Sequence, residues 1–181
     1  QKALECDNTS AFGGIVAFND EVDKKTAELL SEIFLECVVA PSFKKEALDI
    51  LKSKKNLRLL ELNKENLKTT KLLSIKSILG GLLVQDNDNN LVNQNDWECV
   101  TQIKPNKKEM DDMRFSWKIC KHVKSNAIVI AKQGKTIGIG AGQMNRVGAA
   151  KIALDAAKES SKGAVLASDG FFPFSDTVEI A

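Results

Sequence analysis

A glycine-rich segment in the last third of the sequence could bind an anion. A strand-like run ends in Gly138-Ile139-Gly140-Ala141-Gly142-Gln143, and Arg146 follows at the start of an alanine-rich helix. Backbone N–H groups at a helix N-terminus bind anions, and a guanidinium is a bidentate partner for phosphate. The segment is not a dinucleotide fingerprint, because Gln143 stands where the third glycine would be. Close packing of a strand against a helix is the alternative explanation for these glycines.

An aromatic turn follows that helix, in Ser168-Asp169-Gly170-Phe171-Phe172-Pro173-Phe174. Phenylalanines at the end of a hydrophobic strand can form a wall for a flat ring, because ligands of α/β sheets bind at the C-terminal ends of strands. The same phenylalanines could instead fill the core. Asp176 stands near the turn as an acceptor for an amino-substituted ring. Together with the glycine-rich segment, the turn predicts a site for a phosphorylated, ring-bearing small molecule.

Three further polar residues each have a functional and a structural interpretation. Asn126 precedes a buried strand, where it either ends a turn or offers its amide to a heterocycle or a carboxamide. Asp7 either caps its own loop or accepts hydrogen bonds from ribose hydroxyls. His122 is the only histidine, and its position at the end of an amphipathic helix predicts a solvent-facing side chain rather than a catalytic base.

The elements that position these residues alternate between helix and strand. In the first half, the patterns predict a strand within 11–18, helices at 20–37 and 43–52, strands at 57–62, 77–85 and 97–103, and a loop at 86–95. In the second half, they predict helices at 108–123 and 146–159 and strands at 127–131, 136–139 and 164–167. This alternation predicts a layered α/β fold, with mixed sheets, flanking helices and a boundary near Pro105.

The composition argues against several classes of protein. Among 181 residues, 26 Lys and Arg stand against 24 Asp and Glu, so charge gives no reason to expect nucleic acid or a membrane surface as a partner. The apolar runs are too short to span a membrane. The four cysteines are widely spaced and include no C-x-x-C pair, which argues against a zinc site or a disulfide framework and favours the cytoplasm.

Taken together, four motifs resemble the AICAR transformylase region of the AICAR transformylase/IMP cyclohydrolase family, in the order in which the family has them. The motifs are Asp7-Asn8-Thr9-Ser10-Ala11-Phe12-Gly13-Gly14, Ser125-Asn126-Ala127, the Gly138–Gln143 segment with Arg146, and the Ser168–Phe174 turn. The resemblance covers nearly the whole chain and is weakest at 44–107. It implies that residues 1–105 and 106–181 are parts of the first and second transformylase lobes.

The resemblance also implies a fold, a reaction and a set of binding residues. The implied fold is cytidine-deaminase-like without that fold's zinc. The implied reaction transfers a formyl group from the cosubstrate 10-formyltetrahydrofolate to the amino group of AICAR, an aminoimidazole carboxamide ribonucleotide, with no tightly bound cofactor. Positions that match family contacts to AICAR are Asp7, Asn126, Arg146 and Phe171, and those on the folate side are Val147 and Asp176.

Two departures from the family pattern lead us to expect an incomplete enzyme. The family's catalytic Lys-His pair would lie upstream of Gln1, and Lys121-His122 does not match its position. Ser175 stands where many members carry Arg. The expectation is therefore a fragment, cut at both ends and inactive alone, of a cytoplasmic homodimer that also carries a cyclohydrolase. A non-catalytic nucleotide-binding module and a purely structural interaction domain are the alternatives.

Overall fold

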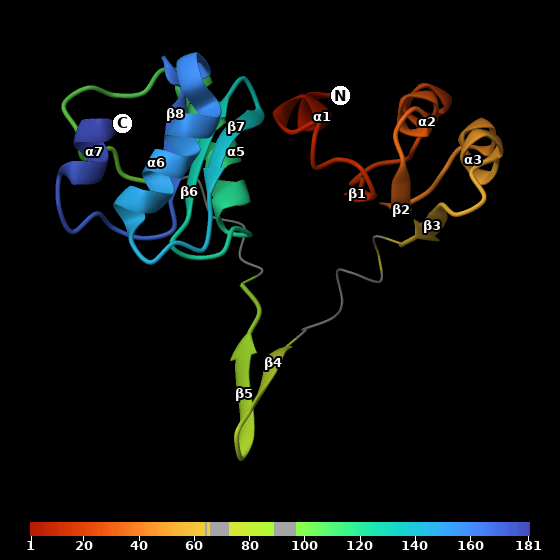
Figure 1. Cartoon of the computed structure of the whole chain (residues 1–181), viewed down its shortest axis with the longest axis horizontal. Coiled ribbons are helices and arrows are strands. Elements are labelled where there is room, and N and C mark those ends of the chain that lie inside the picture. The colour runs from red at the N-terminus through yellow and green to blue at the C-terminus, as the bar shows by residue number, and fades with distance from the viewer. Residues whose placement is uncertain (64, 66–72, 89–96) are drawn as a thin grey trace. The chain divides into compact units, whose positions relative to one another are not determined.

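The chain forms two units of mixed α/β structure (Figure 1). In this computed structural model, the described residues are 1–63, 65, 73–88 and 97–181. One unit comprises Thr9–Cys99, and the other comprises Gln1–Asn8 together with Val100–Ala181. The sequence-based division after residue 105 did not place the first eight residues with the second unit, because local patterns carry no information on such a distant contact. The assignment of these units to transformylase lobes stays a prediction.

The unit of Thr9–Cys99 contains a parallel sheet in the order β1-β2-β3. Its elements are β1 (Gly14–Ala17), α2 (Lys24–Ser31), β2 (Leu35–Ala40), α3 (Lys45–Lys52) and β3 (Arg58–Glu61). Each helix connects two neighbouring parallel strands, as such connections require. A core that includes Val38 of β2, Leu30 of α2 and Leu51 of α3 holds the helices against the sheet. The helix predicted at 43–52 and the strand predicted at 57–62 are confirmed.

The helix predicted at 20–37 is wrong in its second half. α2 ends at Ser31, and Leu35–Ala40 forms β2. Most residues of β2 are shielded from solvent, and a central strand of this kind gives a nearly continuous apolar run that helical spacing matches by chance. The helix is capped by Asp23, whose side chain accepts a hydrogen bond from the Thr26 N–H at 2.9 Å.

Residues 73–86 form an antiparallel hairpin, with β4 (Leu73–Ile78) and β5 (Gly81–Asp86) running side by side (Figure 1). The single strand predicted at 77–85 is wrong, because Gly80 has φ of +80° and belongs to the turn between the two strands. The loop predicted at 86–95 lies mostly outside the described residues. The described segment 97–103 contains no strand, contrary to expectation.

The second unit is built on an antiparallel sheet in the order β7-β6-β8. Its elements are α1 (Lys2–Cys6), α5 (Lys107–Cys120), β6 (Ile128–Lys132), β7 (Lys135–Gly140), α6 (Arg146–Ala157), η2 (Lys158–Ser161), β8 (Val165–Ser168) and α7 (Asp176–Ile180). The helices and strands predicted between 108 and 167 are confirmed, with small shifts at their ends. Among the helices in the described ranges, none is long and apolar enough to cross a membrane.

Helices cover both faces of this sheet. Because successive residues of a strand point to opposite faces, Ile128 and Ile130 pack with the buried alanines of α6, while Val129 packs with Cys120 of α5. The second unit therefore has the layered α/β arrangement that the sequence predicts. This layering brings the first turn of α6 close to the C-terminal end of β8.

Candidate functional site

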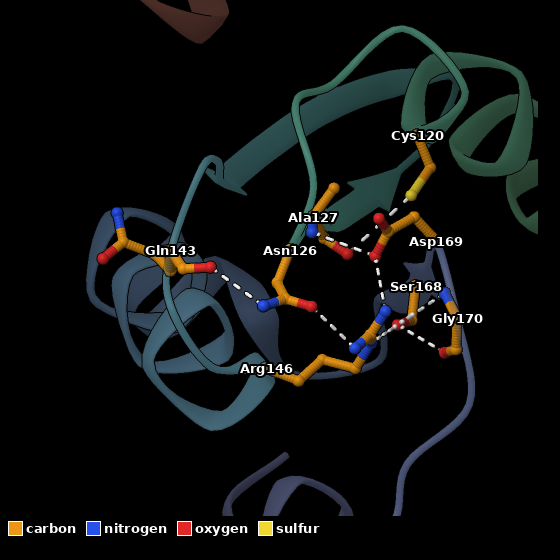
Figure 2. Close-up of polar contacts among 8 residues, drawn as sticks. All are labelled: Cys120, Asn126, Ala127, Gln143, Arg146, Ser168, Asp169 and Gly170. Carbon is orange, nitrogen blue, oxygen red and sulfur yellow. Dashed lines mark hydrogen bonds and ion pairs between the residues drawn. The ribbon is translucent and has the colours of Figure 1, made fainter.

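Arg146 lies in a polar cluster that joins three segments of the second unit (Figure 2). Its guanidinium donates from Nη1 to Oδ1 of Asn126 at 2.7 Å, from Nε to Oγ of Ser168 at 3.0 Å and from Nη2 to Oδ1 of Asp169 at 3.0 Å. Asn126 precedes β6, Arg146 opens α6, and the other two lie at the end of β8. These bonds use three of the five N–H donors that a guanidinium has. Acceptors on separate segments therefore fix the plane of the guanidinium.

Two glycines let α6 approach the sheet closely enough to place Arg146. A Cβ atom at Gly138 would overlap the backbone of Ala153, and one at Gly140 would overlap the backbone of Ala149. The packing explanation is therefore confirmed for both glycines. The anion-binding role of the whole segment stays a prediction.

The N-terminus of α6 is capped by the side chain of the residue that precedes it. Asn145 precedes the helix, and its Oδ1 accepts a hydrogen bond from the Gly148 N–H at 2.7 Å. The sequence correctly places Arg146 in the first turn of this helix. Because a cation there opposes the helix dipole, the acceptors around the guanidinium offset an unfavourable position.

The amide of Asn126 is held in one orientation by two partners. Its Nδ2 donates to the carbonyl oxygen of Gln143 at 2.9 Å, while its Oδ1 accepts from Arg146. In these described contacts, one Nδ2 hydrogen and one Oδ1 lone pair are left for a ligand. Such an amide can donate to and accept from the same heterocycle or carboxamide.

Asp169 links Arg146 to the start of β6. Its Oδ1 accepts from the Ala127 N–H at 3.0 Å as well as from Arg146. Burial by itself would raise the pKa of Asp169, but hydrogen bonds from Ser125 and Ala127 and the charge of Arg146 outweigh it and lower the pKa below its ordinary value. Asp169 is therefore ionised at neutral pH and forms an ion pair with Arg146, in which each side chain is 19% exposed.

Cys120 lies behind this ion pair, on the α5 side of the sheet. Burial raises the pKa of its thiol, the negative charge of Asp169 raises it further, and Arg146 lowers it in part. The sulfur lies 3.9 Å from the carbonyl oxygen of Ala127 as a weak donor (Figure 2). A thiol that stays protonated is a poor nucleophile, so Cys120 serves packing in this cluster.

The aromatic turn divides its phenylalanines between the core and the surface. Phe172 packs against the buried core formed by β6 and α6. Phe171 and Phe174 are 83% and 74% exposed. The core-filling explanation therefore holds for Phe172 only, and the exposed rings lie two and five residues after Asp169 in the chain.

The other predicted binding residues are spread over the second unit. Val147 is half-buried beside Arg146 on α6, and Asp176 is exposed at the start of α7. Asp7 is exposed at the end of α1, which bonds through Lys2 Nζ to the Gln133 carbonyl oxygen at 2.9 Å. Gln133 belongs to the turn between β6 and β7, and this turn lies at the opposite end of β6 from Asn126. The structure thus brings Asn126 and Arg146 together, while the ligand roles of Asp7, Phe171, Val147 and Asp176 stay predictions.

His122 is exposed just beyond α5, as predicted. The sequence analysis missed Ser168 and Asp169 as partners of Arg146, although both lie in the aromatic-turn motif. The sequence feature that could have indicated them was a pair of polar residues, Ser168 and Asp169, at the end of a predicted buried strand. Their partner could not be read from the sequence, because it lies on a helix of the preceding crossover.

Neither of two cavities found in the structure contains these residues. One of about 460 Å³ lies between α1, β7 and α6 and is lined by residues that include Glu5, Cys6 and Lys135. Another of about 340 Å³ lies in the first unit, beside Phe34 and Lys55. In the part of the chain that the structure describes, no group of three or more His, Cys, Asp or Glu side chains could hold a metal ion.

Comparison with known proteins gives matches along the chain. The sequence model of the AICARFT/IMPCHase bienzyme family matches residues 1–156. A bifunctional purine biosynthesis protein PurH from Prochlorococcus marinus strain MIT 9515 is 64% identical over 181 residues, which is 100% of this chain and 35% of that protein. The PurH of strain MIT 9215 is 66% identical over 179 residues, with 99% and 35% coverage. The chain thus spans about a third (35%) of the length of these curated relatives.

Proposed function

The chain belongs to the AICARFT/IMPCHase bienzyme family, and from this membership we propose that it forms part of a formyltransferase. The proposed reaction transfers a formyl group from 10-formyltetrahydrofolate to AICAR, in purine biosynthesis. The longer protein would also carry an IMP cyclohydrolase. This proposal agrees with the purine biosynthesis name of the relatives and with the order of the four motifs in the sequence.

One observation carries the proposal. The family resemblance implies that Asn126 and Arg146 contact the same nucleotide, and the two side chains meet at 2.7 Å although they come from separate segments. A guanidinium beside an amide offers donors for a phosphate and both a donor and an acceptor for a carboxamide. The exposed Phe171 ring, two residues after Asp169 in the chain, is suited to stack on a heterocycle.

In the proposed reaction, the amine nitrogen of AICAR attacks the formyl carbon. A nitrogen–carbon bond forms as the bond from the carbon to the folate nitrogen breaks, the amine proton passes to a base, and the folate nitrogen takes up a proton. A base and a stabiliser of the charged tetrahedral species are therefore needed. We assign both to the Lys-His pair that the family resemblance implies, a pair that Lys121-His122 does not match in position. This chain contributes positioning, which lowers the entropic part of the barrier.

Several further features belong to the same proposal. The layered second unit is compatible with a cytidine-deaminase-like lobe that uses no zinc. We propose a cytoplasmic homodimer with a nucleotide and a folate as its ligands, without nucleic acid, membrane or a tightly bound cofactor. Val147 and Asp176 would lie on the folate side, while Asp7 would accept from the AICAR nucleotide.

A chimera tests the proposal. In it, this chain replaces the matching 35% of the PurH from strain MIT 9515, to which it is 64% identical. The isolated chain and the chimera are mixed with AICAR and 10-formyltetrahydrofolate, and tetrahydrofolate formation is followed. We expect turnover by the chimera and none by the isolated chain. A chimera that binds AICAR without formyl transfer would instead support the nucleotide-binding module, and one that does neither would support the structural domain.

A further inference from the structure

Asp169 occupies a special position among the partners of Arg146. Of the three acceptors around the guanidinium, the carboxylate of Asp169 carries the charge, whereas Asn126 and Ser168 are neutral. All three bonds come from the charged guanidinium, but only Asp169 adds the attraction of an opposite charge, in an ion pair whose side chains are largely shielded from solvent. Asp169 is therefore the partner that contributes most to holding the guanidinium in place.

The carboxylate is itself fixed to the sheet. The Ala127 N–H donates to the same Oδ1 atom that accepts from Arg146, with both distances at 3.0 Å. Ala127 is fully buried directly before β6. Because Asp169 is held by backbone at the start of the central strand β6, the guanidinium that it binds is positioned relative to the sheet and not only relative to its own helix.

The ion pair weakens the electrostatic attraction between Arg146 and an anion. A carboxylate beside the guanidinium offsets its positive charge, so Asp169 cannot improve phosphate binding by electrostatic attraction. Its contribution has to be geometric. A free arginine side chain loses about 2 kcal/mol of rotamer entropy when it is ordered, and a partner that orders it before the ligand arrives removes much of this cost from binding.

We propose that Asp169 is the positioning residue of Arg146, whose guanidinium it holds so that the remaining N–H donors face the phosphate of AICAR. This inference rests on the proposed function. It assigns Asp169 a role through Arg146, in the binding of the nucleotide and not in the formyl transfer step. The expected effect of its loss is therefore on the KM of AICAR, with kcat and the KM of the folate unchanged.

A purely structural role is the competing explanation, because Asp169 also accepts from Ala127. The substitution Asp169→Asn separates the two roles. An asparagine keeps an amide oxygen for the Ala127 N–H and nearly the same shape, but it loses the charge that attracts Arg146. Asp155→Asn is the matched control, since Asp155 is an exposed carboxylate on α6, the same helix that Arg146 opens.

The test is a double-mutant cycle in the chimera, with Asp169→Asn, Arg146→Ala and both together. We expect Asp169→Asn to raise the KM of AICAR about tenfold, while kcat and the folate KM stay within about twofold. In the Arg146→Ala background, Asp169→Asn should have no further effect. Equal effects of Asp169→Asn in both backgrounds, an unchanged KM of AICAR, or a fall in kcat alone would overturn the inference.

Calorimetric binding of AICAR to the same variants separates this inference from the proposed function. If the wild-type chimera binds AICAR without formyl transfer, the proposed reaction is wrong, and the cycle of dissociation constants still decides whether Asp169 acts through Arg146. If it neither binds nor reacts, both proposals are wrong. Far-ultraviolet circular dichroism of each variant excludes unfolding as the cause of a weakened affinity.

Discussion

The Arg146 cluster and the β4–β5 hairpin differ in the contacts that define their structure. In the cluster, Arg146 and Asp169 are each 19% exposed and bond to groups from three segments that are distant in sequence. In the hairpin, six residue pairs keep an unbroken register although every side chain of both strands is exposed. Tertiary contacts define the cluster, whereas pairing between neighbours in sequence defines the hairpin.

This difference predicts that equivalent substitutions will have unequal effects in the two regions. A change in the cluster has to move buried backbone or leave a charge without its partner. A changed side chain in the hairpin stays in contact with solvent. Matched substitutions, one in each region, test this difference.

The largest contrast is expected for a methyl group added to a glycine. In Gly140→Ala, the new Cβ would overlap the backbone of Ala149 in α6, so helix and sheet have to separate. We expect a loss of about 3 kcal/mol in the free energy of unfolding, the upper end for overpacking. In Gly81→Ala at the start of β5, no atom lies within 4 Å of the new Cβ, and we expect a change below about 0.5 kcal/mol.

Native-state hydrogen exchange measures these changes separately in each unit. Gly140→Ala should increase exchange throughout β6, β7 and α6, and leave the protection of β2 unchanged. A loss below about 1 kcal/mol for Gly140→Ala would show that α6 is not packed tightly against β7.

An intermediate effect is expected for the charge of Asp169, and it should depend on pH. Because the folded-state pKa of Asp169 is lowered from the ordinary value of 3.8, its contribution to stability is fully present above that value and is lost as the pH falls through the folded-state pKa. Above pH 5, Asp169→Asn should cost about 1 kcal/mol, the upper end for an ion pair near the surface, because the amide oxygen still accepts the hydrogen bonds and only the charge is lost.

Unfolding in urea at several pH values measures this dependence. The stability difference between wild type and Asp169→Asn should be constant at neutral pH and should shrink toward pH 2. A difference that does not change with pH would show that the amide oxygen replaces the carboxylate fully and that the ion pair contributes nothing to folding.

The sequence predicts the second unit better than the first, for a physical reason. Its helices and strands have clear periodicity and turn residues, and the position of Arg146 in the first turn of α6 follows from them. In the first unit, the shielded strand β2 resembles a helix in its apolar spacing, and the glycine of the hairpin turn resembles a strand irregularity. The periodicity of apolar residues indicates which side of a helix or strand is buried, but it does not indicate which other elements pack against that side.

The candidate site was predictable only in part for the same reason. The motifs identify Asn126, Arg146 and the aromatic turn as related, but the ion pair with Asp169 depends on how closely α6 packs against the sheet. Gly138 and Gly140 make this approach possible. A glycine-rich segment can serve as a ligand loop or as a close contact, and residue types alone do not distinguish the two.

The smallest effect is expected on the hairpin, and a buried valine provides its comparison. Val84 of β5 is 56% exposed and Val129 of β6 is 0% exposed. Threonine has nearly the shape of valine and differs by a hydroxyl, which costs about 1 to 3 kcal/mol when it is buried without a hydrogen bond. We therefore expect Val129→Thr to destabilise the second unit by about that amount. Val84→Thr should change stability by less than about 0.5 kcal/mol, because its hydroxyl stays in water.

Hydrogen exchange of the β4 and β5 amides measures the effect of Val84→Thr in this chain. The same substitution is then measured in the chimera. A loss confined to the chimera would mean that Val84 becomes buried only when the flanking regions are present, which would remove the contrast between the hairpin and the cluster.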